Sequence, residues 1–198
     1  IGYENVFDYS LGNPSGPVPR EFTDCMIELL STQDTNVLHG YSPSLGITSV
    51  REKVAASLEK RFGLPYRKEH IFMASGAAGA LAHAFRLVSQ PGDEILTFAP
   101  FFPEYHPYVD LSGAVLKVVP PDTEAFQINF DKMEEMMNEK VMAVLINTPN
   151  NPSGVVYSAE TLKKLAEVLK RKSEEYGHTI YLISDEPYRE IVFSGVDA

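Results

Sequence analysis

Two short polar segments of this chain carry the residue types best suited to chemistry. They are residues 147–154, NTPNNPSG, and residues 184–190, SDEPYRE, and each directly follows an apolar run. Polar side chains at the carboxyl ends of parallel strands face the ligand crevice of an α/β sheet. We therefore expect an amide, a carboxylate and a phenol, those of Asn151, Asp185 and Tyr188, to converge on one small molecule.

The two segments together resemble the class I and II aminotransferases, which are fold type I pyridoxal-phosphate enzymes, and the chain is similar above all to bacterial aspartate aminotransferases. The resemblance implies that Asn151 and Tyr188 contact the phenolic oxygen of pyridoxal 5'-phosphate and that Asp185 contacts its pyridine nitrogen. A carboxylate there keeps the nitrogen protonated, and a pyridinium accepts carbanion electrons. An aminotransferase that moves an amino group from an amino acid to a 2-oxo acid is thus implied, with Asp185 and Tyr188 catalytic.

These residues also have purely structural interpretations. An aspartate after a hydrophobic strand is often a turn or helix N-cap residue, and Asn147 and Asn151 could simply shape a proline-rich turn. The two motifs occur in the family's order, each after a strand-like run, and this combination favours the functional interpretation.

A phosphate-binding turn is indicated at residues 75–80, SGAAGA, between an apolar run and a helical pattern. Small residues at such a turn let backbone N–H groups approach a phosphate at a helix N-terminus. The segment resembles the family's phosphate cup, which would place Gly76, Ala77 and Ala78 on the cofactor phosphate, although many relatives have Ser, Thr or Lys in place of Ala78. Tight helix packing is the alternative. The segment matches neither a dinucleotide-binding nor a P-loop motif.

Three further contacts are implied by the resemblance alone. Phe102, in the segment PFFPEY at 100–105, matches the ring that stacks on the pyridine, although taken alone it would be interpreted as a core residue. Tyr41, in GYSPSLG at 40–46, matches a tyrosine that reaches the cofactor phosphate of the adjacent subunit, which implies a homodimer. Gly12 matches backbone near the substrate carboxylate, although a turn glycine is an equal alternative.

The family's central residue, a lysine that holds the cofactor as a Schiff base, has no match here. In the family it lies some tens of residues beyond the aspartate, whereas only 13 residues follow Asp185 in this chain of 198, and no lysine in a matching Ser-x-x-Lys context lies beyond the aspartate. The chain also begins at Ile1 without a methionine. We therefore expect a fragment that carries the cofactor cradle of a longer protein and is inactive alone.

Other functions remain open or are disfavoured by particular residues. The same cradle serves C–S β-lyases, and a non-catalytic effector-binding module, like the aminotransferase-like domain of certain bacterial transcription regulators, is a further alternative, although this chain shows no winged helix. A nucleophile elbow at Ser75 would need glycine where Met73 stands. The five histidines show no HxxxH spacing, so no metal site is indicated.

Composition narrows the class of protein. A chain of 198 residues with 44% hydrophobic content can bury a substantial core. The net charge of −10 argues against a nucleic-acid partner. The single cysteine, Cys25, fits a reducing compartment, and no apolar run approaches twenty residues, so we expect a cytoplasmic protein without a membrane span.

From His70 onward, apolar runs alternate with helical patterns, so we expect an α/β fold with a mostly parallel sheet and helices on both faces. By resemblance this is a fold type I large domain, incomplete at its C-terminus. The expected strands are 71–74, 94–98, 115–119, 141–146 and 180–183, and the expected helices are 22–30, 47–62 and one from the N-cap Ser158 to near Gly177. We expect residues 1–38 to contribute to the small domain and the interface, and 39–198 to form the first part of the large domain.

Overall fold

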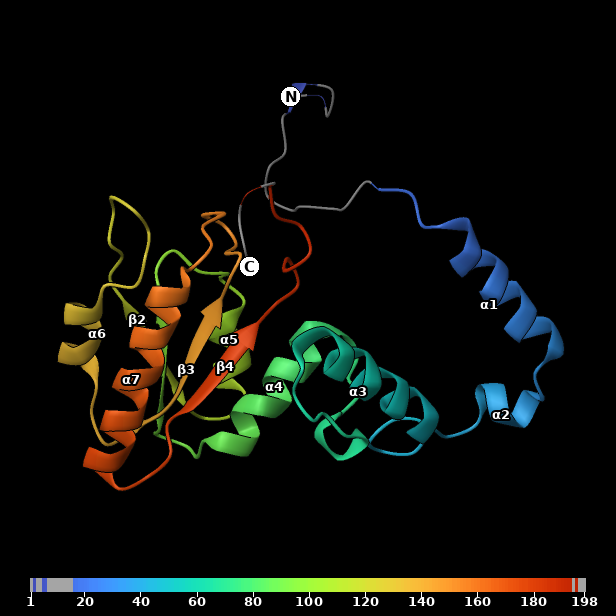
Figure 1. The fold of residues 1–198 in the computed structure, drawn as a ribbon, viewed down its shortest axis with the longest axis horizontal. Helices are drawn as coiled ribbons and strands as arrows, with labels where there is room; N and C mark the ends of the chain where they lie inside the picture. Colours follow the sequence, from blue (N-terminus) through green and yellow to red (C-terminus); the bar gives the residue numbers. More distant parts are fainter. Residues whose placement is uncertain (1, 3–4, 7–15, 194, 196–198) are drawn as a thin grey trace. The chain divides into compact units, whose positions relative to one another are not determined.

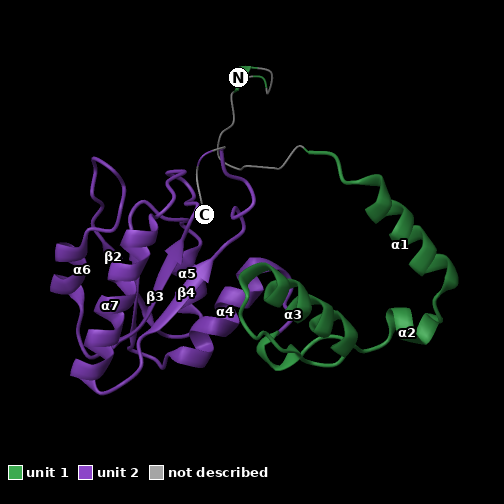
Figure 2. Ribbon diagram, in the orientation of Figure 1, with its two compact units in different colours: residues 1–71 green, residues 72–198 purple. Residues whose placement is uncertain are grey.

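The computed structural model describes residues 2, 5–6, 16–193 and 195. The chain divides into two compact units, residues 1–71 and residues 72–198, which Figure 2 shows in different colours. The first unit contains helices, and the second contains a sheet with helices. The predicted division into residues 1–38 and 39–198 stays a prediction.

The first unit contains three α-helices and a 3-10 helix in its described part. They are α1 (Arg20–Thr32), α2 (Thr35–His39), α3 (Thr48–Phe62) and η2 (Lys68–His70). The predicted helix over 47–62 is confirmed as α3, which ends where Gly63 adopts a left-handed conformation with φ 67°. The buried Arg51 ties α3 to η2, because its guanidinium donates to the carbonyl oxygens of Lys68 and Ile71 at 2.6 and 2.8 Å.

The second unit is built on a parallel sheet of four strands (Figure 1). The strands are β1 (Glu94–Phe98), β2 (Val115–Val119), β3 (Val141–Asn147) and β4 (Tyr181–Asp185), and the helices are α4 (Gly76–Val88), α5 (Tyr105–Asp110), α6 (Phe130–Met136) and α7 (Ala159–Tyr176). The strand order is β2-β1-β3-β4, and every neighbouring pair is parallel. Four of the five predicted strands are therefore confirmed.

Helices cover both faces of this sheet, as the sequence predicts. Alternate residues of a strand point to opposite faces, so Val144 and Ile146 of β3 join the core cluster formed with α6 and α7. Ala143 and Leu145 join the other cluster, which contains residues of α4 and α5. The predicted α/β fold class is thus confirmed.

The predicted helix after Ser158 is confirmed as α7. The Ser158 hydroxyl accepts a hydrogen bond from the backbone N–H of Thr161 at 3.0 Å, which caps the helix. The buried residues Leu165, Val168 and Leu169 of α7 lie on one face, because positions three and four apart share a helix face. No helix in the described part of the chain is long and apolar enough to cross a membrane.

The predicted strand over 71–74 is wrong, because these residues are in no strand. Phe72 and Met73 are exposed, and the four-stranded sheet pairs without this segment. The apolar residues 191–193 likewise form no strand, and Ile191 and Phe193 are exposed. A strand requires hydrogen bonds to a neighbouring strand as well as apolar residues, and that pairing is not visible in a local pattern.

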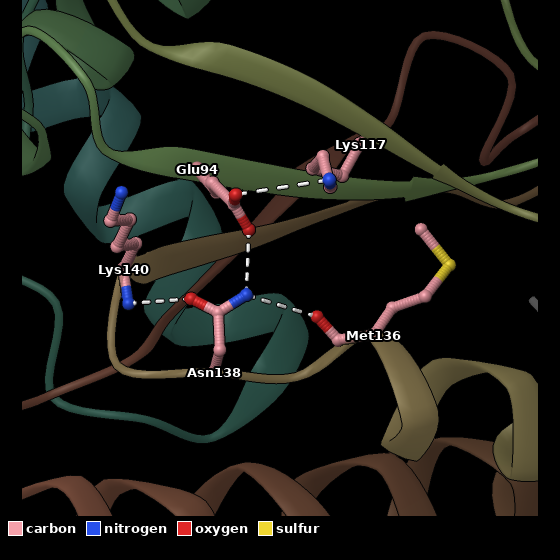
Figure 3. Close-up of polar contacts among 5 residues, drawn as sticks. All are labelled: Glu94, Lys117, Met136, Asn138 and Lys140. Carbon is pink, nitrogen blue, oxygen red and sulfur yellow. Dashed lines mark hydrogen bonds and ion pairs between the residues drawn. The ribbon is translucent and has the colours of Figure 1, made fainter.

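A polar network links the start of β1, the middle of β2 and the loop that leads into β3 (Figure 3). The carboxylate of Glu94, in β1, accepts a hydrogen bond from the Asn138 amide at 2.8 Å and lies 3.8 Å from the Lys117 ammonium of β2. The Asn138 carbonyl in turn accepts from the backbone N–H of Lys140, just before β3, at 2.8 Å. Because Glu94 begins β1 and Lys140 directly precedes β3, this network lies toward the end of the sheet opposite to the predicted ligand site.

Candidate active site

The topology of the second unit has a switch point between β1 and β3. The connection from β1 to β2 runs through α5, whose buried residues belong to one core cluster, and the connection from β2 to β3 runs through α6, in the other cluster. The strand order therefore reverses between β1 and β3. Ligands of open α/β sheets bind at the carboxyl ends of the strands at such a switch point.

Asp185, the last residue of β4, reaches this edge in a fixed orientation. The Tyr105 hydroxyl, at the start of α5, donates a hydrogen bond of 2.7 Å to Oδ2 of Asp185. Burial, together with this hydrogen bond, raises the pKa of Tyr105 above its ordinary value, so the phenol remains a donor at neutral pH. One carboxylate oxygen is thus held by the protein, and the other can accept from a ligand N–H group.

Tyr105 was not predicted to be a site residue, although it is the last residue of the segment PFFPEY at 100–105. The side chain is 1% exposed, and its ring lies edge-on to that of Phe102 with centroids 5.7 Å apart. A buried tyrosine needs a partner for its hydroxyl, but the burial of Tyr105 is seen only in the structure. The partner lies 80 residues away, so the sequence alone could not identify it.

Asn151 and Tyr188 lie together, as the sequence predicts. The Asn151 side-chain amide donates to the Tyr188 hydroxyl at 3.4 Å, and Tyr188 is 36% exposed. Asn147, the last residue of β3, pairs in register with Asp185 and donates to its carbonyl oxygen at 2.8 Å. The structure therefore brings Asn151, Asp185 and Tyr188 to the carboxyl ends of β3 and β4.

The N-terminus of α4 has donors available for an anion. Ser75, its N-cap residue, makes no side-chain capping hydrogen bond, and residues 75–78 are exposed. Because residues 89–93 lead directly from the end of α4 to the start of β1, the helix begins at the carboxyl edge of the sheet. Gly76 has φ 76°, a conformation that favours glycine, and leads into the exposed first turn with Ala77 and Ala78.

Of the remaining predicted residues, Phe102 is linked to Asp185 through Tyr105, because the rings of Phe102 and Tyr105 lie edge-on and the Tyr105 hydroxyl bonds the carboxylate. Phe102 is half-buried against the core cluster that contains Tyr105, which fits both interpretations of its ring. Tyr41 belongs to the first unit, where its side chain is fully exposed. Gly12 lies outside the described residues. Across residues 2, 5–6, 16–193 and 195 there is no group of three or more His, Cys, Asp or Glu that could hold a metal ion.

The fold is that of a parallel α/β protein, and polar side chains gather at the carboxyl ends of its strands β3 and β4. The family described as aminotransferase class I and II matches residues 4–198, and the chain belongs to this family. Enzymes of this family use pyridoxal phosphate. The predicted family is therefore confirmed.

Individual relatives agree with this assignment. An aspartate aminotransferase of Thermotoga maritima is 31% identical over 96% of the chain and 48% of the relative. A solved amino transferase of Eubacterium rectale has a TM-score of 0.94 and 46% identity, over 98% of this chain and 49% of that one. The solved Thermotoga maritima aspartate aminotransferase has a TM-score of 0.86 at 30% identity. The chain thus spans about half the length of the proteins that it matches.

Proposed function

We propose that the protein containing this chain is a pyridoxal-phosphate-dependent aminotransferase that transfers an amino group between an amino acid and a 2-oxo acid. The observation that carries the proposal is the position of Asp185 at the carboxyl edge of the sheet, held through Oδ2 by Tyr105. A carboxylate fixed in this way is suited to accept from a protonated ring nitrogen, which is the interaction this cofactor requires.

The other site residues fit the remaining polar groups of the cofactor. Asn151 and Tyr188, which lie within 3.4 Å of each other, would share its phenolic oxygen. The uncapped N-terminus of α4 at Gly76, Ala77 and Ala78 would receive its phosphate. When bound, pyridoxal phosphate supplies an electron sink for the carbanion formed at the substrate α-carbon.

Phe102, Tyr41 and Gly12 extend the proposal on the strength of the family motifs. Phe102 would cover one face of the cofactor ring, and the position of its half-buried ring just after β1 supports this role. The exposed Tyr41 is available to a second subunit, which supports a homodimer. Gly12 would approach the substrate carboxylate. The single cysteine supports a cytoplasmic location.

Aspartate is the proposed amino donor, because relatives of 28–31% identity are named aspartate aminotransferases. Other relatives are named for prephenate, N-acetyl-LL-diaminopimelate or aromatic amino acids, so these substrates belong in the panel that tests the proposal. A C–S β-lyase and a non-catalytic binding module are the alternatives that the same cradle permits.

The test uses the complete protein, its Asp185→Asn variant and a panel of substrates. We expect amino-group transfer from aspartate to 2-oxoglutarate, and a loss of at least about tenfold in rate in the variant, since a hydrogen bond to a charged group contributes roughly 1.5–3 kcal/mol. Release of pyruvate and ammonia from a cysteine S-conjugate, without transfer, would assign a lyase. Cofactor binding without turnover of any substrate would assign a binding module.

A further inference from the structure

Asn147 is a buried polar residue with no assigned chemistry. Among the hydrogen bonds observed in the described part of the chain, its side chain alone bonds both the backbone of Asn151 and the backbone of Asp185 in β4. It is 4% exposed and ends β3, opposite Asp185 in the strand register. Its Oδ1 accepts from the backbone N–H of Asn151 at 2.7 Å, and its Nδ2 donates to the Asp185 carbonyl oxygen at 2.8 Å.

The local backbone explains why a side chain takes this place. Pro149 has no N–H group, so the chain cannot continue the ladder of β3 toward β4 by backbone donors at that residue. The Asn147 amide supplies a donor to β4 and an acceptor to the following loop. An asparagine suits this place because its amide carries a donor and an acceptor on two separate atoms, whereas an ionised aspartate lacks the donor and a leucine lacks both.

We propose that Asn147 is a positioning residue that fixes Asn151 and Asp185 relative to each other, so that the amide and the carboxylate reach the same cofactor ring. This proposal rests on the proposed function. Asn147 acts through the backbones of its two partners and itself contacts neither cofactor nor substrate. Its removal leaves both functional side chains in the protein but frees the loop that carries Asn151 from the strand that carries Asp185.

The test compares Asn147→Ala with Asn150→Ala in the complete protein. Asn150 is the matched control, because its side chain accepts from the backbone N–H and the hydroxyl of Ser153 and therefore bonds within the same loop only. Two quantities are measured for each variant. They are the hydrogen-exchange rate of the residue-151 amide without cofactor, and the dissociation constant of pyridoxal phosphate from an absorbance titration of the folded protein.

We expect Asn147→Ala to raise the exchange rate at residue 151 and to weaken cofactor binding, each by about tenfold, which equals the effect of about 1.4 kcal/mol. Asn150→Ala should stay within about twofold of the wild type in both quantities. If Asn147→Ala does not fold, Asn147→Ser, which keeps one hydroxyl as donor or acceptor, is measured in the same way and should be affected in the same direction.

Two outcomes overturn the proposal, and they are distinguishable. If the folded Asn147 variants bind the cofactor as tightly as the wild type does, with lower thermal stability alone, then Asn147 has a structural role only and the proposed function stands. If the wild-type protein does not bind pyridoxal phosphate, the proposed function fails, and the role of Asn147 toward this cofactor fails with it.

Discussion

Asp185 is held at two different atoms by residues from distant parts of the chain. Its carbonyl oxygen accepts from Asn147 and its carboxylate from Tyr105, which lie 38 and 80 residues earlier. Neither hydrogen bond uses an exposed, mobile side chain, since Tyr105 and Asn147 are 1% and 4% exposed. The orientation of this carboxylate is therefore set by the core of the sheet and not by the loop that follows it.

Removal of the Tyr105 hydroxyl tests this orientation. We expect Tyr105→Phe to keep the fold and to weaken cofactor binding or turnover about tenfold, because a hydrogen bond to a charged group contributes roughly 1.5–3 kcal/mol. Tyr108→Phe is the control, since its hydroxyl donates to the exposed Glu104 four residues earlier. Equal activities for the two variants would mean that Tyr105 does not position Asp185.

The identities of Asn151, Asp185 and Tyr188 could be predicted because polar residues after apolar runs are a local pattern. Their proximity is seen only in the structure, through the contact between Asn151 and Tyr188 and the strand register that carries Asp185. The hydrogen bonds from Tyr105 and Asn147 to Asp185 were not predicted, because they join positions that only the folded sheet brings together.

At the scale of whole elements, local sequence patterns predict most of the strands, and the predicted strand over 71–74 is the exception. The strands β1 to β4 have apolar runs that pair with a neighbour, whereas residues 71–74 are equally apolar and pair with none of the four. The start of α7 was predictable from one residue, because Ser158 bonds its own helix. A strand pairs with residues far away in the sequence, whereas a cap residue bonds to a residue only a few positions along its own helix.

The capping role of Ser158 leads to a stability prediction. Ser158→Ala should lower the free energy of unfolding by about 1 kcal/mol, because the backbone N–H of Thr161 loses its acceptor. Ser158→Asp should retain most of the stability, since a carboxylate also caps a helix. Urea unfolding curves followed by circular dichroism give both values, and an unchanged midpoint in Ser158→Ala would show that the cap contributes nothing.

For the molecule as a whole, buried tyrosines predict how stability depends on alkaline pH. Burial raises the pKa of Tyr157 to about 12 from its ordinary value of 10.0. Folding therefore favours the neutral phenol, and the stability that this difference provides is complete below pH 10 and is lost as the pH rises from 10 toward 12. Burial shifts the pKa of Tyr105 in the same direction.

Tyr157→Phe should therefore reduce the loss of stability between pH 10 and pH 12, because phenylalanine has no proton to release. Unfolding free energies of variant and wild type, measured at a series of pH values from 7 to 12, give the comparison. An identical alkaline slope in both proteins would contradict the assignment of this loss to Tyr157.

A second prediction for the whole molecule concerns the oligomeric state of the complete protein. We expect a homodimer, and we expect Tyr41→Phe to weaken cofactor binding without unfolding the protein, since the exposed Tyr41 is proposed to reach the phosphate site of a second subunit. Sedimentation measurements of mass, combined with cofactor titration, test both parts. A fully active monomer would refute the interface role of Tyr41.

The central claim is that the carboxylate of Asp185 meets the pyridine nitrogen of pyridoxal phosphate, and nitrogen NMR tests it most directly. The complete protein and its Asp185→Asn variant are each loaded with cofactor labelled with ¹⁵N in the ring, and the chemical shift of that nitrogen is recorded at neutral pH. We predict a protonated nitrogen in the wild type and an unprotonated one in the variant, since a neutral amide does not stabilise the pyridinium. The same protonation state in both proteins would contradict the account.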